Sequence, residues 1–224
     1  MKTIKGLIFD FDGLIIDTEY AKYLSWQEIF QSFQVDLSFE VIESIFWHAD
    51  GSNSLISHLE DKVGRKLDAQ VIIQRALQRF HEILSQFEMR AGVYDYLVQA
   101  DQMGLKMVLA SNAKHAQIQP LIDRLQIGHF FRSILTSEDV CNPKPDPELL
   151  NLTVQRMALE TGEVIAFDDS NIGLKAARSA GIFCVVVPNQ LTIHFYIDHP
   201  DLLLPSFTEK TLYSLLEDTK HSIL

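Results

Sequence analysis

IKGLIFDFDG, residues 4–13, is a short apolar run that ends on two carboxylates and a glycine. Side chains two residues apart on a strand point to the same face, so a strand over residues 4–9 would leave Asp10 and Asp12 close together at its C-terminal end. Two like charges make each other harder to ionise unless a cation or a reaction uses them. Gly13 permits the backbone turn that follows. The pair is therefore either a strand end with solvated acids or part of a functional site. Residues elsewhere in the chain distinguish these two interpretations.

Five further apolar runs predict strands, and helical patterns lie between them. Their consecutive positions are apolar, which is typical of parallel strands that are buried on both faces. Strands that alternate with helices predict an α/β fold with a parallel sheet. The five runs cover residues 105–110, 133–136, 164–167, 182–187 and, as a possible sixth strand, 202–204.

Two helix starts can be predicted from capping residues. Asp146 is placed as an N-cap, with Pro147 at the first helical position before Glu148. Residues 206–209 read SFTE, which is the capping-box spacing, and predict the start of a final helix.

The segment between the first two predicted strands, residues 10–104, is far longer than a single crossover helix requires. A structureless loop of this length would be unusual in a compact domain. Apolar residues recur at helical spacing in most of it, so we expect a helical insert over residues 17–88 that leaves and rejoins the sheet beside Asp10 and Asp12. Residues 1–16 and 89–224 would then form one α/β domain. The predicted insert helices lie near residues 23–33, 41–46, 55–63 and 73–87.

The composition excludes several classes of function. The formal net charge of −11 argues against a nucleic-acid partner and against anionic membrane surfaces, because both depend on Lys and Arg. No apolar run approaches the ~20 residues of a membrane span, and Asp10 and Asp12 interrupt the N-terminal run too early for a signal peptide. Two cysteines provide no disulfide framework. We expect a soluble, cytoplasmic protein.

Three more polar groups follow or flank predicted strands: Ser111-Asn112, Lys144 between two prolines, and Asp168-Asp169-Ser170. Taken alone, Ser111-Asn112 is more typical of a helix cap and Lys144 of a solvated surface lysine, and Asp168-Asp169 is typical of a loop or an N-cap. In an open parallel sheet, however, ligands bind outside the carboxyl ends of the strands, where such groups converge on one crevice. Their joint occurrence at the same end of successive strands favours a site over solvated strand ends.

This set of motifs resembles the haloacid dehalogenase-like hydrolase superfamily, and residues 17–19 and 169–181 resemble its phosphatase branch. The resemblance covers the predicted α/β domain, whereas the insert matches that branch's helical cap in placement and length but only loosely in sequence. It implies a Rossmann-like parallel sheet core with an inserted α-helical cap domain. The motifs are Asp10-x-Asp12-Gly13, Ser111-Asn112, Lys144-Pro145-Asp146 and Asp168-Asp169-Ser170-x-x-Gly173.

The resemblance also implies a reaction. Asp10 would be the nucleophile that attacks phosphorus to give an aspartyl-phosphate. Asp12 would be the general acid that protonates the leaving oxygen and then the base that activates water. The substrate would be a small phosphorylated metabolite, because a helical cap that closes over the cleft leaves little room for a macromolecule. A monomer is expected.

The same resemblance implies a metal and a phosphate site. Mg²⁺ would be held by the carboxylates of Asp10 and Asp169 and by the backbone carbonyl of Asp12, since hard oxygen ligands suit this ion. Asp168 would support the metal through water. The phosphate would be bound by Lys144, by the Ser111 hydroxyl and by the backbone N–H of Asn112.

Three alternatives stay open at this point. A dehalogenase shares the fold and nucleophile, but that branch lacks an acid at the position of Asp12. A β-phosphoglucomutase-like phosphomutase is similar at Thr18 and Trp26, but it usually has His where this chain has Lys22, and an Arg near Gly51 where none stands here. A catalytically silent binding module on the same fold would tend to lose the nucleophile or the lysine.

Other polar residues are harder to interpret. A polar segment lies between two predicted insert helices, where its side chains either contact the substrate or form a solvated turn. Its residues are His48, Asp50, Ser52 and Asn53. Cys141 lies near Lys144, and we expect it to be buried and inert.

Overall fold

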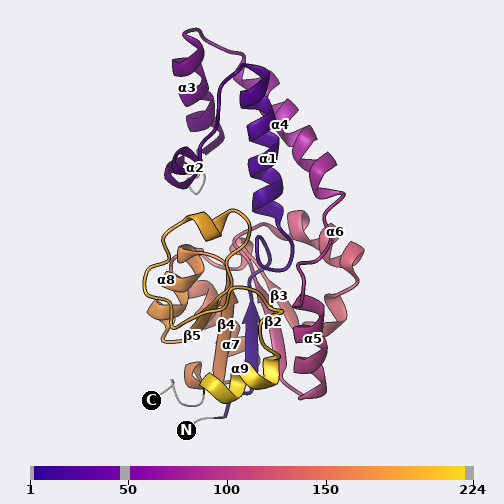
Figure 1. Cartoon of the computed structure of the whole chain (residues 1–224). Helices are drawn as coiled ribbons and strands as arrows, with labels where there is room; N and C mark the ends of the chain where they lie inside the picture. Colours follow the sequence, from indigo (N-terminus) through magenta and orange to yellow (C-terminus); the bar gives the residue numbers. More distant parts are fainter. Residues whose placement is uncertain (1–2, 46–50, 220–224) are drawn as a thin grey trace.

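The computed structural model describes residues 3–45 and 51–219 and shows a parallel sheet with helices on both faces, above which stands a group of helices (Figure 1). The six predicted apolar runs are all strands, so the α/β prediction is confirmed. The sheet order in the described residues is β3-β2-β1-β4-β5-β6, and every pair is parallel. The strands are β1 (Gly6–Phe9), β2 (Lys106–Ala110), β3 (Ser133–Leu135), β4 (Val164–Asp168), β5 (Phe183–Val186) and β6 (Leu202–Leu203).

The strand order reverses between β1 and β4, which are neighbours in the centre of the sheet. From β1 the chain runs outward to β2 and β3, then returns to β4 on the other side of β1. Phe9 pairs with Phe167 in the register, so the residues that follow β1 emerge beside the end of β4. This is the switch point at which open α/β sheets bind ligands.

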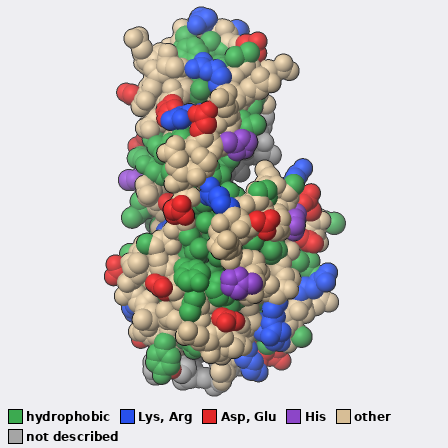
Figure 2. All heavy atoms as spheres, turned by 90° about the vertical axis from the view of Figure 1, so that its right-hand side faces the viewer, with side chains coloured by type: hydrophobic (Ala, Val, Ile, Leu, Met, Phe, Trp, Pro, Cys, Tyr) green, Lys and Arg blue, Asp and Glu red, His purple; other side chains and the backbone are tan. Residues whose placement is uncertain are grey.

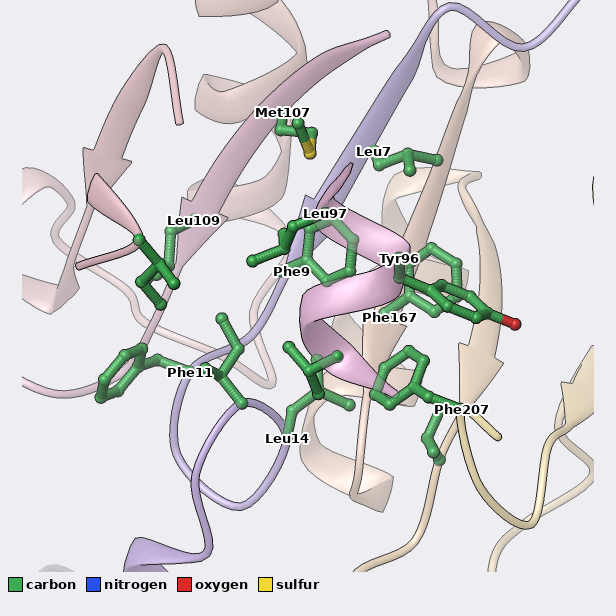
Figure 3. Packing of buried hydrophobic residues seen from close by; sticks show 14 of the residues in the cluster. Leu7, Phe9, Phe11, Leu14, Tyr96, Leu97, Met107, Leu109, Phe167 and Phe207 are labelled. Atoms are coloured by element: carbon green, nitrogen blue, oxygen red, sulfur yellow. The ribbon is translucent and has the colours of Figure 1, made fainter. Parts of the chain in front are cut away.

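Alternate strand residues face two separate apolar clusters, as the two-residue period of a strand requires. One face, which includes Phe9 and Phe167, packs against α5 (Val93–Gln102), α6 (His115–Leu125) and α9 (Leu212–Thr219). The other packs against α7 (Glu148–Met157) and α8 (Asn171–Ala180). Figure 3 shows the first cluster, where the rings of Phe9 and Phe167 stack with centroids 5.0 Å apart and Tyr96 of α5 packs edge-on against Phe207. Short 3₁₀ helices lie at Gly128–Phe130, Ser137–Asp139, Thr161–Glu163 and Thr192–His194.

Both predicted helix starts are displaced. The Asp146 carboxylate accepts the backbone N–H of Glu148 at 2.9 Å, but α7 begins at Glu148 with Pro147 as its N-cap, one residue later than predicted. Residues 206–209 instead form a turn, in which the Ser206 hydroxyl accepts the N–H of Thr208. The final helix starts only at Leu212, so the capping-box prediction for this segment is wrong.

Between β1 and α5 lie α1 (Thr18–Ser32), α2 (Phe39–Ile45), α3 (Gly51–Val63) and α4 (Ala69–Leu84), which we call the helical insert. These helices stand together beyond the carboxyl ends of the strands (Figure 1). They bury an apolar cluster of their own, to which all four contribute and which includes Trp26, Ile42, Leu59 and Ile72. The lower end of α4 also packs against the sheet cluster through Ile83 and Leu84.

The surface shows no extended charged patch on the face in Figure 2, where acidic and basic side chains are interspersed. Among the described residues, no helix is long and apolar enough to cross a membrane.

Candidate active site

Three carboxylates meet at the ends of β1 and β4. Asp10, Asp168 and Asp169 each present an oxygen, and these oxygens lie within 4.8 Å of one another. All three side chains are buried. Burial, together with the neighbouring carboxylates, raises the pKa of Asp10 to about 7 even though Lys144 acts in the opposite direction. The same causes raise the pKa of Asp169 well above its usual value. Such a group suits a divalent cation that prefers carboxylate oxygen.

Lys144 supplies the positive charge that this group requires. Its ammonium donates to Asp10 Oδ1 at 2.7 Å and to Asp168 Oδ2 at 2.9 Å, and the side chain is almost completely buried. Burial alone would lower the pKa of Lys144, but the two carboxylates outweigh it and raise the pKa. The lysine is therefore charged at neutral pH, and the sequence-based interpretation as a solvated surface lysine does not apply.

The Asn112 side chain fixes the backbone of Lys144. Its Oδ1 accepts the Lys144 N–H at 2.9 Å, and its Nδ2 donates to the Lys144 carbonyl at 2.7 Å. Asn112 follows β2 and Lys144 follows β3 after a loop, so this pair of bonds joins two segments that are distant in sequence. The sequence analysis had assigned only the backbone N–H of Asn112 to the site and missed this function of its side chain.

Asp12 lies on the next turn and is held by two hydroxyls. Thr18 Oγ1 donates to Asp12 Oδ1 at 2.7 Å, and Ser111 Oγ donates to Asp12 Oδ2 at 3.0 Å. Burial raises the pKa of Asp12, while these two hydrogen bonds lower it in part. Thr18 is the first residue of α1, so the carboxylate contacts the base of the helical insert as well as the end of β2.

Gly13 is required where it stands. Its φ is +77°, and a Cβ atom there would lie 2.5 Å from Asp169 Oδ2 and 2.6 Å from Asn189 Nδ2. The tight turn after Asp12 therefore passes directly over Asp169. Asn189 itself donates to Asp169 Oδ2 at 2.6 Å. The sequence analysis missed Asn189, although it is a polar residue just past the carboxyl end of β5 and the strand-end argument could have found it.

Asp168 has hydrogen-bond partners on both of its carboxylate oxygens. Its Oδ2 accepts from Lys144, and its Oδ1 accepts the N–H and the hydroxyl of Ser170 at 3.1 and 2.8 Å. Gly173 of α8 leaves room for this carboxylate, because a Cβ there would overlap it. Asp168 thus orients Lys144 and the start of α8.

A cavity of about 790 Å³ opens from this cluster toward the helical insert. Glu19 and Lys22 of α1 lie in its wall beside Asp12. Burial and the carboxylates of Asp169, Asp12 and Asp10 raise the pKa of Glu19 well above its usual value. The Lys22 side chain is exposed, yet partial desolvation beside the cavity lowers its pKa, while the charges of Glu19 and Asp12 act in the opposite direction. Further in, α4 and α6 contribute mainly apolar wall residues, among them Ile73, Leu77, Phe80, Ala116 and Leu121.

Some residues from the sequence analysis lie elsewhere or outside the described part. Ser52 lines the cavity, whereas His48 and Asp50 fall outside the described residues. Cys141 is exposed, so the expectation that it is buried is wrong. Its backbone N–H donates to the Glu148 carboxylate, which holds this loop against the start of α7 at the surface.

Comparison with known proteins agrees with this geometry. The haloacid dehalogenase-like hydrolase family model matches residues 7–187, a range that runs from the second residue of β1 to just past β5 and includes all the motifs above. The chain belongs to this family. The protein YhcW of Bacillus subtilis, whose name assigns it provisionally to the phosphatases, is 36% identical over 214 residues, which cover 96% of this chain and 97% of that protein.

Two further comparisons are with proteins of different activities. The phosphorylated carbohydrates phosphatase of Thermotoga maritima is 26% identical over 80% of this chain and 82% of its own length. The crystal structure of a beta-phosphoglucomutase from Clostridium difficile has a TM-score of 0.72 at 21% identity, covering 99% of both chains. The latter shows that the fold is shared, and at that identity it shows nothing more.

Proposed function

We propose that this chain is a Mg²⁺-dependent phosphatase that hydrolyses a small phosphate monoester through an aspartyl-phosphate on Asp10. The observation that supports this most is the buried Asp10, which Lys144 contacts at 2.7 Å at the switch point of the sheet. A buried, ionised carboxylate is destabilising unless a positive charge compensates it or it takes part in a reaction. Here a bound cation would compensate the charge, and the carboxylate would attack the phosphoryl group.

In the first half of the reaction a carboxylate oxygen of Asp10 attacks phosphorus, and the bond from phosphorus to the leaving oxygen breaks. Asp12 gives its proton to that oxygen. The raised pKa of Asp12 favours the protonated form that this step needs. In the second half Asp12 takes a proton from water, whose oxygen attacks phosphorus and releases Asp10 and inorganic phosphate.

The remaining charged and polar groups would bind the phosphoryl oxygens. Lys144 is already in place beside Asp10, and we assign it to neutralise the attacking oxygen and the phosphate together. The Ser111 hydroxyl, which is fully buried, and the Asn112 N–H follow β2 and would complete the phosphate site.

A divalent cation fits the carboxylate group. Asp10 and Asp169 would hold it with their carboxylates and Asp12 with its backbone carbonyl, and the six oxygen ligands of Mg²⁺ leave room for water and substrate. When bound, the ion would neutralise the carboxylates and stabilise the charge that develops on the phosphoryl oxygens.

We assign residues 17–88 to a cap domain and residues 1–16 and 89–224 to the α/β domain. The insert buries its own apolar cluster and forms the far wall of the cavity above Asp10 and Asp12. Closure of such a cap would exclude bulk water and large substrates, which favours a small phosphorylated metabolite.

A phosphomutase shares the first half of this reaction and must exclude water in the second. The His that such enzymes usually present is Lys22 here, and it lies in the cavity wall with Asp12. An ammonium donates hydrogen bonds and accepts none, so it cannot act as the imidazole would. We therefore favour hydrolysis. With β-glucose 1-phosphate, Mg²⁺ and a trace of glucose 1,6-bisphosphate, any product should be free phosphate, and faster formation of glucose 6-phosphate would overturn this choice.

The proposal is tested by turnover of an aryl phosphate with and without Mg²⁺. Wild-type protein should release phosphate only with the cation, and Asp169→Ala should lose that dependence together with activity. A protein that binds phosphate esters without turning them over would identify a silent binding module instead. A screen against phosphorylated metabolites would then define the substrate.

A further inference from the structure

We propose that Asn189 is a positioning residue that orients the metal ligand Asp169. It is 3% exposed, and its Nδ2 donates to Asp169 Oδ2 at 2.6 Å. Oδ2 is thus bonded to Asn189, and in this proposal the other carboxylate oxygen binds the cation. The inference rests on the proposed metal site but not on the identity of the substrate.

The orientation of the Asn189 amide is fixed by its own backbone segment. Its Oδ1 accepts the N–H groups of Leu191 and Thr192 at 2.7 and 2.8 Å, so the opposite end of the amide must be the donor that faces Asp169. Thr192 Oγ1 accepts the Asn189 N–H at 2.9 Å and lies 3.5 Å from Asp169 Oδ2. The turn from Asn189 to Thr192 therefore aims its donors at one carboxylate oxygen.

Neighbouring segments hold this turn in place. The Arg90 guanidinium donates to the carbonyls of Val187 and Pro188 at 3.1 and 2.6 Å and to that of Gly13 at 2.6 Å. It thereby joins the segment that carries Asn189 to the turn after Asp12. Leu191 has no exposed surface and packs into the apolar cluster of the helical insert. The amide thus cannot turn away from Asp169 without disturbing both parts of the molecule.

Outer partners of this kind typically change metal affinity by about 10–100-fold when they are removed. We therefore expect Asn189→Ala to raise the Mg²⁺ dissociation constant, measured by isothermal titration calorimetry, by about 10–100-fold. The matched control is Asn171→Ala. Asn171 bonds the Tyr196 carbonyl and the Asp198 N–H, so its loss loosens the far end of the same segment without touching Asp169. Its dissociation constant should stay within about twofold of wild type.

The fold of each variant is checked by thermal unfolding without metal. If Asn189→Ala does not fold, Thr192→Val decides, because it preserves shape and removes the hydroxyl that accepts the Asn189 N–H and lies 3.5 Å from Asp169 Oδ2, so that the turn loses part of its hold on this carboxylate. It should weaken Mg²⁺ binding by a few-fold to about tenfold. An unchanged dissociation constant in whichever variant folds, or equal weakening in Asn171→Ala, would overturn the assignment. The phosphatase proposal is judged separately: wild type that binds Mg²⁺ but shows no turnover refutes that proposal alone, whereas wild type that binds no Mg²⁺ refutes both.

Discussion

Lys144→Met should destabilise the protein in a way that depends on pH. The substitution keeps an apolar stem of similar length and removes the charge that lies 2.7 Å from Asp10 and 2.9 Å from Asp168. Removing one partner of a buried ion pair typically costs about 3–5 kcal/mol, because the remaining charge stays buried without compensation. We expect a loss of that size at pH 8 in the absence of divalent cations.

Lowering the pH should reverse part of this loss. Lys144 lowers the pKa of Asp10, which is about 7 with the lysine in place, so its removal raises that pKa further. Between pH 7 and the new pKa, Asp10 stays protonated in the variant but not in wild type, so each pH unit there lowers the unfolding free energy of the variant relative to wild type by about 1.4 kcal/mol. At pH 5 Asp10 is protonated in both folded proteins and this part disappears. The difference in unfolding free energy between wild type and variant should therefore be smaller at pH 5 than at pH 8, by up to about 1.4 kcal/mol.

Urea unfolding at the two pH values, with EDTA present, measures this difference. Lys106→Met is the control, since the Lys106 ammonium donates to the Met157 carbonyl and is distant from the carboxylate group. Its effect should be the same at both pH values. If Lys144→Met caused an equal loss at pH 5 and pH 8, the assignment of Lys144 as the charge that stabilises Asp10 would be refuted.

Three further predictions follow from the same site. Turnover at low Mg²⁺ should rise with pH through a midpoint near 7, because Asp10 must lose its proton to attack. A higher Mg²⁺ concentration should move this midpoint to lower pH. A midpoint that does not change with Mg²⁺ would show that Asp10 is not a metal ligand. Saturating Mg²⁺ should raise the melting temperature more at pH 8 than at pH 5, because protons compete with the cation for the same carboxylates. An equal rise at both pH values would argue against these carboxylates as metal ligands. Gly13→Ala should lower the free energy of unfolding by about 1–3 kcal/mol and weaken Mg²⁺ binding, because its Cβ would meet Asp169. Gly104→Ala is the control: it has a similar φ of +69° and open space around it, so it should lose only the part due to backbone strain. Equal losses of unfolding free energy in the two variants would show that the contact with Asp169 is unimportant.

Much of the fold could be predicted because its signals are local. A buried parallel strand needs a short apolar run, and each of the six runs became a strand. The strand-end argument also brought Asp10, Lys144, Asp168 and Asp169 to one place, because the carboxyl ends of parallel strands share one edge.

What the sequence did not reveal depends on contacts between distant segments. Nothing near Asn112 indicates that its side chain bonds the Lys144 backbone, since those residues meet only when β2 and β3 pair. Asn189 differs: it reaches Asp169 because β4 and β5 are neighbours, and its place past the end of β5 could have been predicted, although its bond to Asp169 could not. The capping box at residues 206–209 failed for a related reason: Phe207 is buried against Tyr96, which fixes this segment as a turn before the helix can start.

The central claim is that Asp10 forms a covalent bond to phosphorus, and trapping that bond tests it most directly. Asp12→Asn protein lacks both the acid of the first half and the base that activates water in the second. It is therefore mixed with Mg²⁺ and an aryl phosphate whose leaving group departs without protonation, quenched in acid and mapped by mass spectrometry. One phosphoryl group should be found on the peptide that contains Asp10, and Asp10→Asn should show none and retain almost no turnover. A phosphoryl group on another residue, or Asp10→Asn turnover above about a tenth of wild type, would contradict the account.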